Sequence, residues 1–226
     1  MKKASLVVLL VILLASLLAA CGGSAGSDNK GAPKKKVALV LPEKMGVNAF
    51  FTQMDEGLKK AGEDFGVEVK TIESTDPSAV EQNLRAAVAD GYDLIITAAF
   101  SAVDALTKVA GENPDKPFAI VDDVVDLPNV RSVAFREHEA SFLLGAAAGL
   151  ITKTNTVGAV VAMDVPLMKK FTDGFEQGLK HTNPSAKFLV HYVGSFTDPA
   201  KAKELALLQF EQGADFIAGM SAVSDN

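Results

Sequence analysis

The sequence predicts an α/β fold in which parallel sheets carry helices on both faces. Short apolar runs of strand length alternate with longer segments whose apolar residues recur every three or four positions. The alternation pauses near residue 153 and then starts again. A composition of 48% hydrophobic and 22% charged residues is typical of a chain with a large apolar core. We therefore expect two doubly wound units, each built on a parallel sheet.

The first unit is expected over residues 36–153. Its predicted strands are residues 37–41, 67–72, 93–97, 117–121 and 130–135. The first helix presents an apolar face made by Phe50, Met54, Leu58, Ala61 and Phe65, and Gly66 ends it. Further helices are predicted over residues 79–89, 101–110 and 140–151. The last of these is apolar nearly all round, which predicts that it is fully buried, with Gly145 and Gly149 allowing close packing.

The second unit is expected over residues 154–226. Strands are predicted at residues 157–163, 188–193 and 216–218, with helices at 167–179 and 200–212. A doubly wound unit needs further strands and helices to cover its sheet. We therefore expect this unit to be incomplete and the chain to be truncated.

The amino terminus has the three parts of a secretory signal. Lys2 and Lys3 are followed by an apolar stretch over residues 6–14 and by Leu18-Ala19-Ala20-Cys21. Cys21 is the single cysteine of the chain, and it stands where a bacterial lipoprotein signal places the residue that is acylated, for instance with palmitate. Residues 1–20 are thus predicted to be a signal peptide and residues 21–35 a flexible tether. A signal anchor over residues 4–20 is the alternative, at the short limit for crossing a bilayer.

Charge and composition exclude several classes of function. The formal net charge of −6, with one short lysine run at residues 34–36, argues against nucleic acid as a partner. A single cysteine allows no intrachain disulfide, and three scattered histidines have no metal-ligand spacing, so neither a metal nor another cofactor is expected. Nucleophile-elbow, phosphate-loop and zinc-protease motifs are absent from the sequence, and the adjacent Asp122 and Asp123 would point to opposite faces of a strand. We expect a binding protein, not an enzyme.

Candidate ligand-binding residues follow the strands, because ligands of open parallel sheets bind beyond the carboxyl ends of the strands. The aromatic candidates are Phe50, Phe51, Phe100 and Phe196, whose rings could stack on a flat ligand, although Phe50 could equally pack in the core. The acidic candidates are Asp122, Asp123 and Asp164, which could accept hydrogen bonds from hydroxyls or amines. Asp122 ends an apolar strand, where a carboxylate is costly unless something satisfies it.

Four runs of sequence carry a resemblance to a known family. They are GYDLII at residues 91–96, FAIVDDVVD at 118–126, MDVPL at 163–167 followed by Phe171, and GSFTDPAK at 194–201. These runs resemble the basic membrane protein family, the purine nucleoside receptor type of substrate-binding lipoproteins that serve ABC transporters. The resemblance covers nearly all of residues 36–217.

The resemblance implies a type I periplasmic-binding-protein fold whose two lobes close on a nucleoside without catalysis. It also implies a monomer, held by its lipid at the extracytoplasmic face of the cell membrane, that delivers the ligand to ABC permease subunits. In the family a ring at the start of the first helix stacks on the base, and Phe50 stands at that position. The sequence departs from the family in the asparagine that follows this ring, in an aspartate replaced by Leu41, and in the turn at residues 219–222. The family's ribose-binding aspartate and lysine lie beyond this chain.

Three other functions stay open from the sequence. A ligand-sensing surface receptor for a sugar or another small solute would share the fold and the lipid anchor. A surface nucleoside hydrolase would need more than the unpaired aspartates found here. A cytoplasmic sugar-responsive repressor would carry a helix-turn-helix where this chain has a signal peptide.

Overall fold

The computed structural model describes residues 34–46, 48–76 and 78–225. The predicted signal peptide, Cys21 and the tether up to residue 33 lie outside these residues. Among the helices of the described ranges, none has the length and apolar character needed to cross a membrane.

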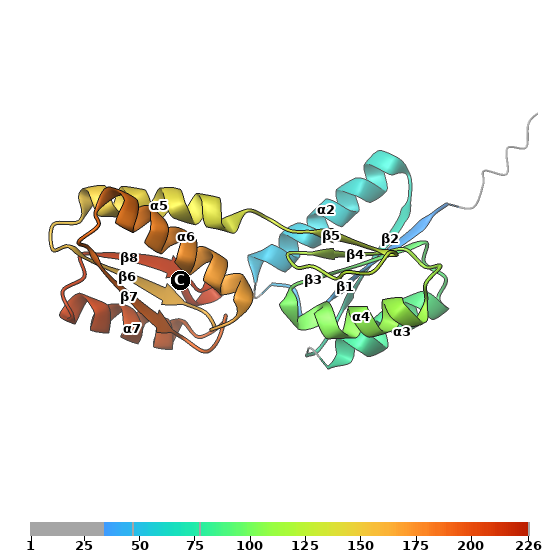
Figure 1. Cartoon of the computed structure of the whole chain (residues 1–226). Helices are drawn as coiled ribbons and strands as arrows, with labels where there is room; N and C mark the ends of the chain where they lie inside the picture. Colours follow the sequence, from blue (N-terminus) through green and yellow to red (C-terminus); the bar gives the residue numbers. More distant parts are fainter. Residues whose placement is uncertain (1–33, 47, 77, 226) are drawn as a thin grey trace, which may run out of the picture. The chain divides into compact units, whose positions relative to one another are not determined.

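The first sheet has five parallel strands in the order β2-β1-β3-β4-β5. They are β1 (Lys36–Leu41), β2 (Glu68–Glu73), β3 (Leu94–Ala98), β4 (Phe118–Val121) and β5 (Val130–Val133). The chain steps from β1 to β2 and then back across β1 to β3, so right-handed crossovers place helices on both faces. Figure 1 shows α2 (Ala49–Phe65) on one face and α3 (Ala79–Ala89) with α4 (Val103–Glu112) on the other.

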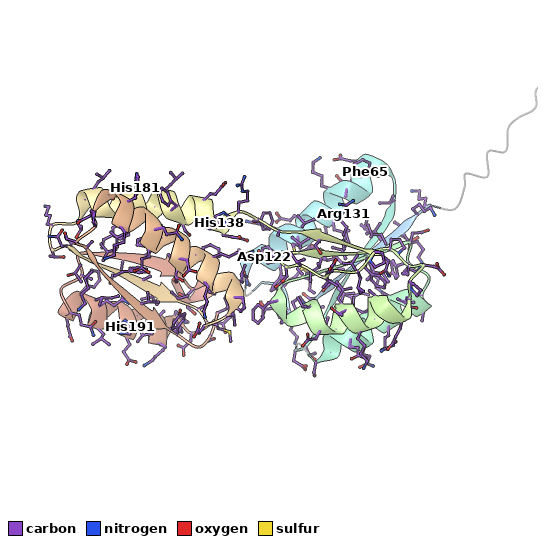
Figure 2. All side chains as sticks on the ribbon, viewed as in Figure 1. Phe65, Asp122, Arg131, His138, His181 and His191 are labelled. Atoms are coloured by element: carbon purple, nitrogen blue, oxygen red, sulfur yellow. The ribbon has the colours of Figure 1, made fainter. Side chains whose placement is uncertain are left out.

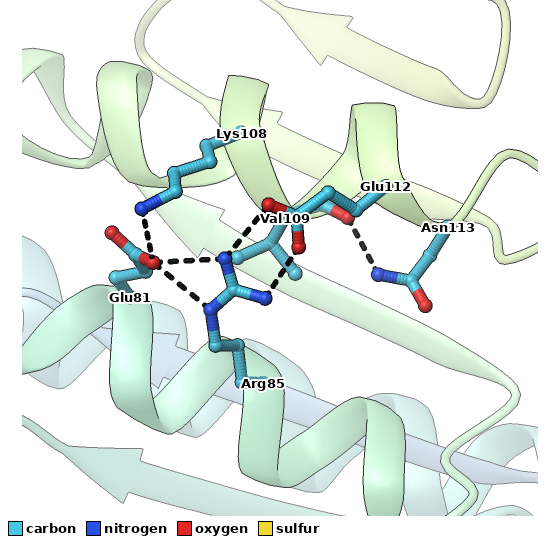
Figure 3. Close-up of polar contacts among 6 residues, drawn as sticks. All are labelled: Glu81, Arg85, Lys108, Val109, Glu112 and Asn113. Carbon is cyan, nitrogen blue, oxygen red and sulfur yellow. Dashed lines mark hydrogen bonds and ion pairs between the residues drawn. The ribbon is translucent and has the colours of Figure 1, made fainter.

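Helices α3 and α4 are joined on their outer surface by a network of charged side chains. Arg85 on α3 pairs with Glu81 one turn earlier at 2.9 Å and with Glu112 on α4 at 2.5 Å (Figure 3). Lys108 on α4 reaches the same Glu81 carboxylate at 2.8 Å. Hydrogen bonds from Lys108 and Arg85 lower the pKa of Glu81, and Arg85 lowers the pKa of Glu112. The network links the two helices over a core cluster that contains Leu84 and Leu106.

The second sheet has three parallel strands in the order β7-β6-β8. They are β6 (Thr156–Val161), β7 (Lys187–Tyr192) and β8 (Phe216–Met220). Figure 1 shows α5 (Glu137–Ile151) and α6 (Pro166–Thr182) on one face of this sheet and α7 (Pro199–Glu211) on the other. Two parallel sheets flanked by helices confirm the predicted α/β fold class.

Helix α5 packs against α6 through glycines at close backbone approaches. A Cβ at Gly145 would overlap the carbonyl of Phe175, and one at Gly178 would overlap the carbonyl of Phe142. The sequence placed this helix in the first unit, whereas the structure packs it on α6 over the second sheet. The boundary proposed at residue 153 therefore separates α5 from the sheet that it covers.

The prediction that the 140–151 helix is fully buried is wrong. Leu143, Leu150 and Ile151 are 69%, 74% and 59% exposed. The glycine face of α5 contacts α6, and no described residue covers the opposite apolar face. Uniform apolar character therefore could not reveal which face of the helix is packed.

The apolar face predicted for the first helix packs as expected along most of α2, but its last residue does not. Phe50, Met54 and Leu58 do pack toward the first sheet. Phe65 is 79% exposed, because it is the last residue of α2 and Gly66 turns the chain away in a left-handed conformation with φ 65°. The helix predicted at residues 101–110 begins with a 3-10 turn, η1 (Phe100–Ala102), before α4.

Candidate functional site

A cavity of about 500 Å³ lies at the carboxyl ends of four strands. Glu43 follows β1, Phe100 follows β3, Asp122 follows β4, and Gly219 and Met220 end β8. The volume is in the usual range for a small-molecule site, and the place is where open parallel sheets bind ligands. The other lining residues are Asn48, Phe50, Ala99, Ser101, Leu167, Met168, Phe171, Phe196, Ala222 and Asp225.

Four phenylalanine rings supply the apolar walls of the cavity. Phe50 begins α2, and Phe171 lies in α6. Phe100 and Phe196 face each other with ring centroids 6.1 Å apart and ring planes tilted by 36°. Aromatic side chains stack favourably on flat ligands, above all on ligands that contain an aromatic ring.

The polar groups of the cavity are mainly hydrogen-bond acceptors. Burial raises the pKa of Glu43, and a hydrogen bond with Asn48 partly opposes that rise. The Asn48 side chain caps α2 by accepting a hydrogen bond from the Phe50 backbone N–H at 3.0 Å. Asp225 accepts a hydrogen bond from the Ser221 backbone N–H at 2.8 Å. Carboxylates at both sides of the cavity fit a ligand that carries hydroxyl or amine donors.

Strained backbone is concentrated at this cavity. Among the described residues, four that are not glycine have a left-handed φ, and three of them, Ala99 (φ 69°), Asp122 (φ 71°) and Ala222 (φ 54°), line it. Such conformations cost free energy and persist where the surrounding structure fixes them, which is common at binding sites. For Asp122, a backbone hydrogen bond from its N–H to the Val133 carbonyl, 2.8 Å long, holds the turn.

Among the residues that line the cavity, Asp122 has the most strongly shifted pKa. Its carboxyl group stands at the end of β4 and is half-buried (Figure 2). Burial, and next the negative charge and hydrogen bond of Glu137, raise the pKa of Asp122 to about 6. Perturbed carboxyl groups in a concave site are candidates for ligand contact.

The structure brings four of the seven predicted ligand-binding residues to the cavity and leaves three outside it. Phe50, Phe100, Phe196 and Asp122 line the cavity, and Asp123 does not. Phe51 is 4% exposed and packs in the core under α2, because adjacent helix residues point about 100° apart. The Asp164 side chain is 60% exposed and lies 3.5 Å from Lys169, because the turn after β6 directs it outward while Met168 faces the cavity.

Sequence reasoning missed some polar groups of the site. It noted the loss of an asparagine after the stacking ring, whereas the structure places Asn48, two residues before Phe50, at the cavity. An asparagine directly before a helix is a capping signal, and capping fixes its side chain next to the helix start. Asp225 lies five residues after the end of β8, and no local pattern marks it as a cavity residue.

The described residues contain no cluster of histidine, cysteine, aspartate or glutamate that could hold a metal ion. His138, His181 and His191 lie well apart on the elements around the second sheet (Figure 2).

A family model described as Bmp, ABC transporter substrate-binding protein PnrA-like, matches residues 34–225. The CD4+ T-cell-stimulating antigen of Listeria innocua is 34% identical over an alignment of 208 positions that covers 86% of this chain and 58% of that protein. The ABC transporter nucleoside-binding protein BmpA of Lactococcus lactis is 32% identical over 201 residues, covering 86% of this chain and 57% of that protein.

Solved structures show the same fold. An ABC transporter solute-binding protein of Aeropyrum pernix superposes with a TM-score of 0.74 at 28% identity, over 84% of this chain and 56% of that one. The chain thus spans less than three fifths of the length of each of these three relatives.

Proposed function

Because the chain belongs to the Bmp family of PnrA-like ABC transporter substrate-binding proteins, we propose that it binds a nucleoside in this cavity as a monomer and delivers it to the permease subunits of an ABC importer. The family is one of binding proteins, not of enzymes. The name of the Lactococcus relative supports the nucleoside as ligand class.

The observation that carries the proposal is the pairing of aromatic walls with acidic groups in one cavity. A nucleoside has a flat base, which stacks between rings, and a ribose with hydroxyl donors. Phe50, Phe100 and Phe171 supply rings for the base. Asp122 supplies an acceptor for a ribose hydroxyl or a base amine.

Isothermal titration calorimetry on the full chain tests the ligand class. Adenosine, guanosine, inosine, cytidine and uridine are titrated separately, with ribose as the comparison. At least one nucleoside should release or absorb heat with saturation at one site. No heat with any nucleoside would remove the proposal, and heat with ribose alone would place the protein among sugar receptors.

A matched pair of phenylalanine variants locates the binding. Phe50→Ala removes a ring that lines the cavity, and stacking of one base is worth about 1–3 kcal/mol, so affinity should fall at least about fivefold. Phe65→Ala removes an exposed ring of the same helix and should leave affinity unchanged. Equal effects of the two substitutions would contradict binding at this cavity.

We also propose that Cys21 carries the lipid that anchors the protein at the extracytoplasmic face of the membrane. The support is the sequence of a lipoprotein signal before this single cysteine. Cells expressing the chain should incorporate labelled palmitate into it, and Cys21→Ala should abolish the label. Labelling that survives this substitution would refute the anchor.

A further inference from the structure

The cavity of the candidate site carries negative charge without a matching side-chain cation. Among the described residues that line it, three are acids, Glu43, Asp122 and Asp225, and none is a lysine, arginine or histidine. None of the three acids forms an ion pair within the described part of the chain. Carboxylates that are partly removed from water are costly unless a partner offsets their charge.

The two lysines that follow Met168 on α6 pair with acids outside the cavity lining. The ammonium nitrogen of Lys170 lies 3.5 Å from Glu137 Oε2, and the side chain of that glutamate is 8% exposed. The ammonium nitrogen of Lys169 lies 3.5 Å from the Asp164 carboxylate, which is turned to solvent. The charges of both lysines are therefore matched elsewhere.

Helix amino ends supply only part of the missing positive charge. Helix α2, helix α6 and the turn η1 that leads into α4 begin at the cavity, where Phe50, Leu167 and Ser101 line it. Each helix amino end is equivalent to about half a positive charge, so three ends offset about half of the charge of three carboxylates. At α2, the N–H of Phe50 already donates to Asn48 Oδ1 at 3.0 Å. The cavity therefore keeps a net negative field.

The aromatic walls suit a cation as well as a flat ring. The face of a phenylalanine ring is negative, and it attracts a cation that lies within about 6 Å of the ring centre. The ring centroids of Phe100 and Phe196 are 6.1 Å apart, so one cation can lie within that range of both rings. Phe50 and Phe171 add two more rings to the same cavity. Rings grouped in this way form the aromatic cages that bind quaternary ammonium groups.

We infer that the cavity selects nucleosides whose base carries a positive charge, such as 1-methyladenosine and 3-methylcytidine, over neutral nucleosides of the same shape. The inference rests on the proposed function for the nucleoside, and on the charge and the rings of the cavity for the cation. In both of these nucleosides a methyl group on a ring nitrogen leaves the base cationic at neutral pH. The charged base stacks on the phenylalanine rings, and its exocyclic nitrogen donates a hydrogen bond to a carboxylate.

The acid–base behaviour of the cavity agrees with this selectivity. Burial is the main cause that raises the pKa of both Glu43 and Asp122. A raised carboxyl pKa means that the surroundings compensate the ionised form less well than water does. A cationic ligand supplies the compensation that the described lining lacks.

The experiment compares matched pairs of ligands by isothermal titration calorimetry on the full chain at pH 7. The pairs are 1-methyladenosine with 1-methylinosine, and 3-methylcytidine with 3-methyluridine. The second member of each pair keeps the methyl group and is neutral. The cationic member of at least one pair should bind about tenfold more tightly, as expected for a cation–π contact that is shielded from water. Raising the salt from about 0.05 M to about 0.5 M should weaken binding of the cation and leave the neutral ligand unchanged.

Variants of the acids test the cause of the preference. Asp122→Asn and Glu43→Gln each remove one negative charge at nearly constant shape, so each should reduce the preference about three- to fivefold. Asp126→Asn removes an exposed charge from the loop after β4, outside the described lining, and should leave the preference unchanged. If one of the two cavity variants does not fold, the other still decides the question.

Equal affinity within both pairs, or tighter binding of the neutral members, would overturn the inference and leave nucleoside binding intact. A third pair without ribose, 1-methylnicotinamide and neutral nicotinamide, separates the two proposals. A preference for 1-methylnicotinamide with no binding of any nucleoside would refute the proposed function and support the charge selectivity of the cavity. No binding of any of these ligands would refute both.

Discussion

Two aspartates at the amino ends of strands are dominated by the hydrogen bonds that they accept, whereas two acidic side chains at the carboxyl ends are dominated by burial. Asp93 directly precedes β3 and Asp215 directly precedes β8, and both have a lowered pKa. Asp122 and Glu43 follow strands at the opposite end, and both have a raised pKa. The same residue type therefore serves stability at one end of the sheets and is left available for a ligand at the other.

The two stabilising aspartates make the same contact in both sheets. Asp93 accepts a hydrogen bond from the Lys36 backbone N–H at 2.8 Å, where β1 begins. Asp215 accepts one from the Thr152 hydroxyl at 2.6 Å and others from the N–H groups of Lys153 and Thr154, just before β6. Each aspartate follows a left-handed glycine by two residues. The repeated contact ties the starts of two neighbouring strands together, β3 to β1 in the first sheet and β8 to β6 in the second.

The largest effect is expected from Asp122→Asn at the carboxyl end. It removes a charged acceptor from the ligand site, and such a hydrogen bond is worth about 10–100-fold in affinity. The amide also relieves the repulsion with Glu137, so thermal stability should not fall. Calorimetry and a thermal melt on the same variant check both statements. A variant that binds normally, or that is strongly destabilised, would place Asp122 with the structural aspartates.

Asp215→Asn at the amino end should do the reverse. It weakens three hydrogen bonds at the start of β6, so the melting temperature should fall by about 2–4 °C while nucleoside affinity stays the same. Glu211→Gln, an exposed change at the end of α7, is the matched control and should not alter the melting temperature. A loss of affinity without a loss of stability would break the distinction between the two ends.

Stability should change with pH in two ranges and in opposite directions. The folded pKa of Asp122, about 6, is above its unfolded value, so the folded state binds more protons and stability falls as pH rises from about 4 to about 6. The pKa of Asp215, about 2, is below its unfolded value, so its stabilisation is complete above pH 4 and is lost as pH falls toward 2. Thermal melts should therefore show higher stability at pH 5 than at pH 7, and Asp122→Asn should remove most of that difference.

The smallest effect is expected from Arg85→Gln in the α3–α4 network. Its partners are exposed carboxylates, and surface ion pairs contribute little and are screened by salt. The melting temperature should change by less than about 2 °C at 0.15 M salt, and the difference should shrink further at 1 M. A larger loss that persists in high salt would show that helix register depends on the network itself.

The sequence by itself determined the order and class of the elements. Apolar runs and helical periods predicted eight strands and placed the helix ends within about three residues, with residues 79–89 matched at both ends. Gly66 and the glycines before Asp93 and Asp215 are local signals, because a left-handed conformation is a property of one residue and its neighbours. The family resemblance depended on such contiguous runs, and the match over residues 34–225 confirms it.

Only the tertiary structure decided which of two neighbouring residues serves the site. Phe50 and Phe51 are equivalent in sequence, and the direction in which the helix faces the sheet assigns one to the cavity and the other to the core. The exposure of Leu143 and Leu150 likewise depends on what lies beside α5, not on the composition of the helix. The raised pKa of Asp122 arises from its burial and from charged groups on other elements. Local sequence fixes hydrogen bonds within a few residues, whereas the chemistry of the cavity depends on groups that only folding brings together.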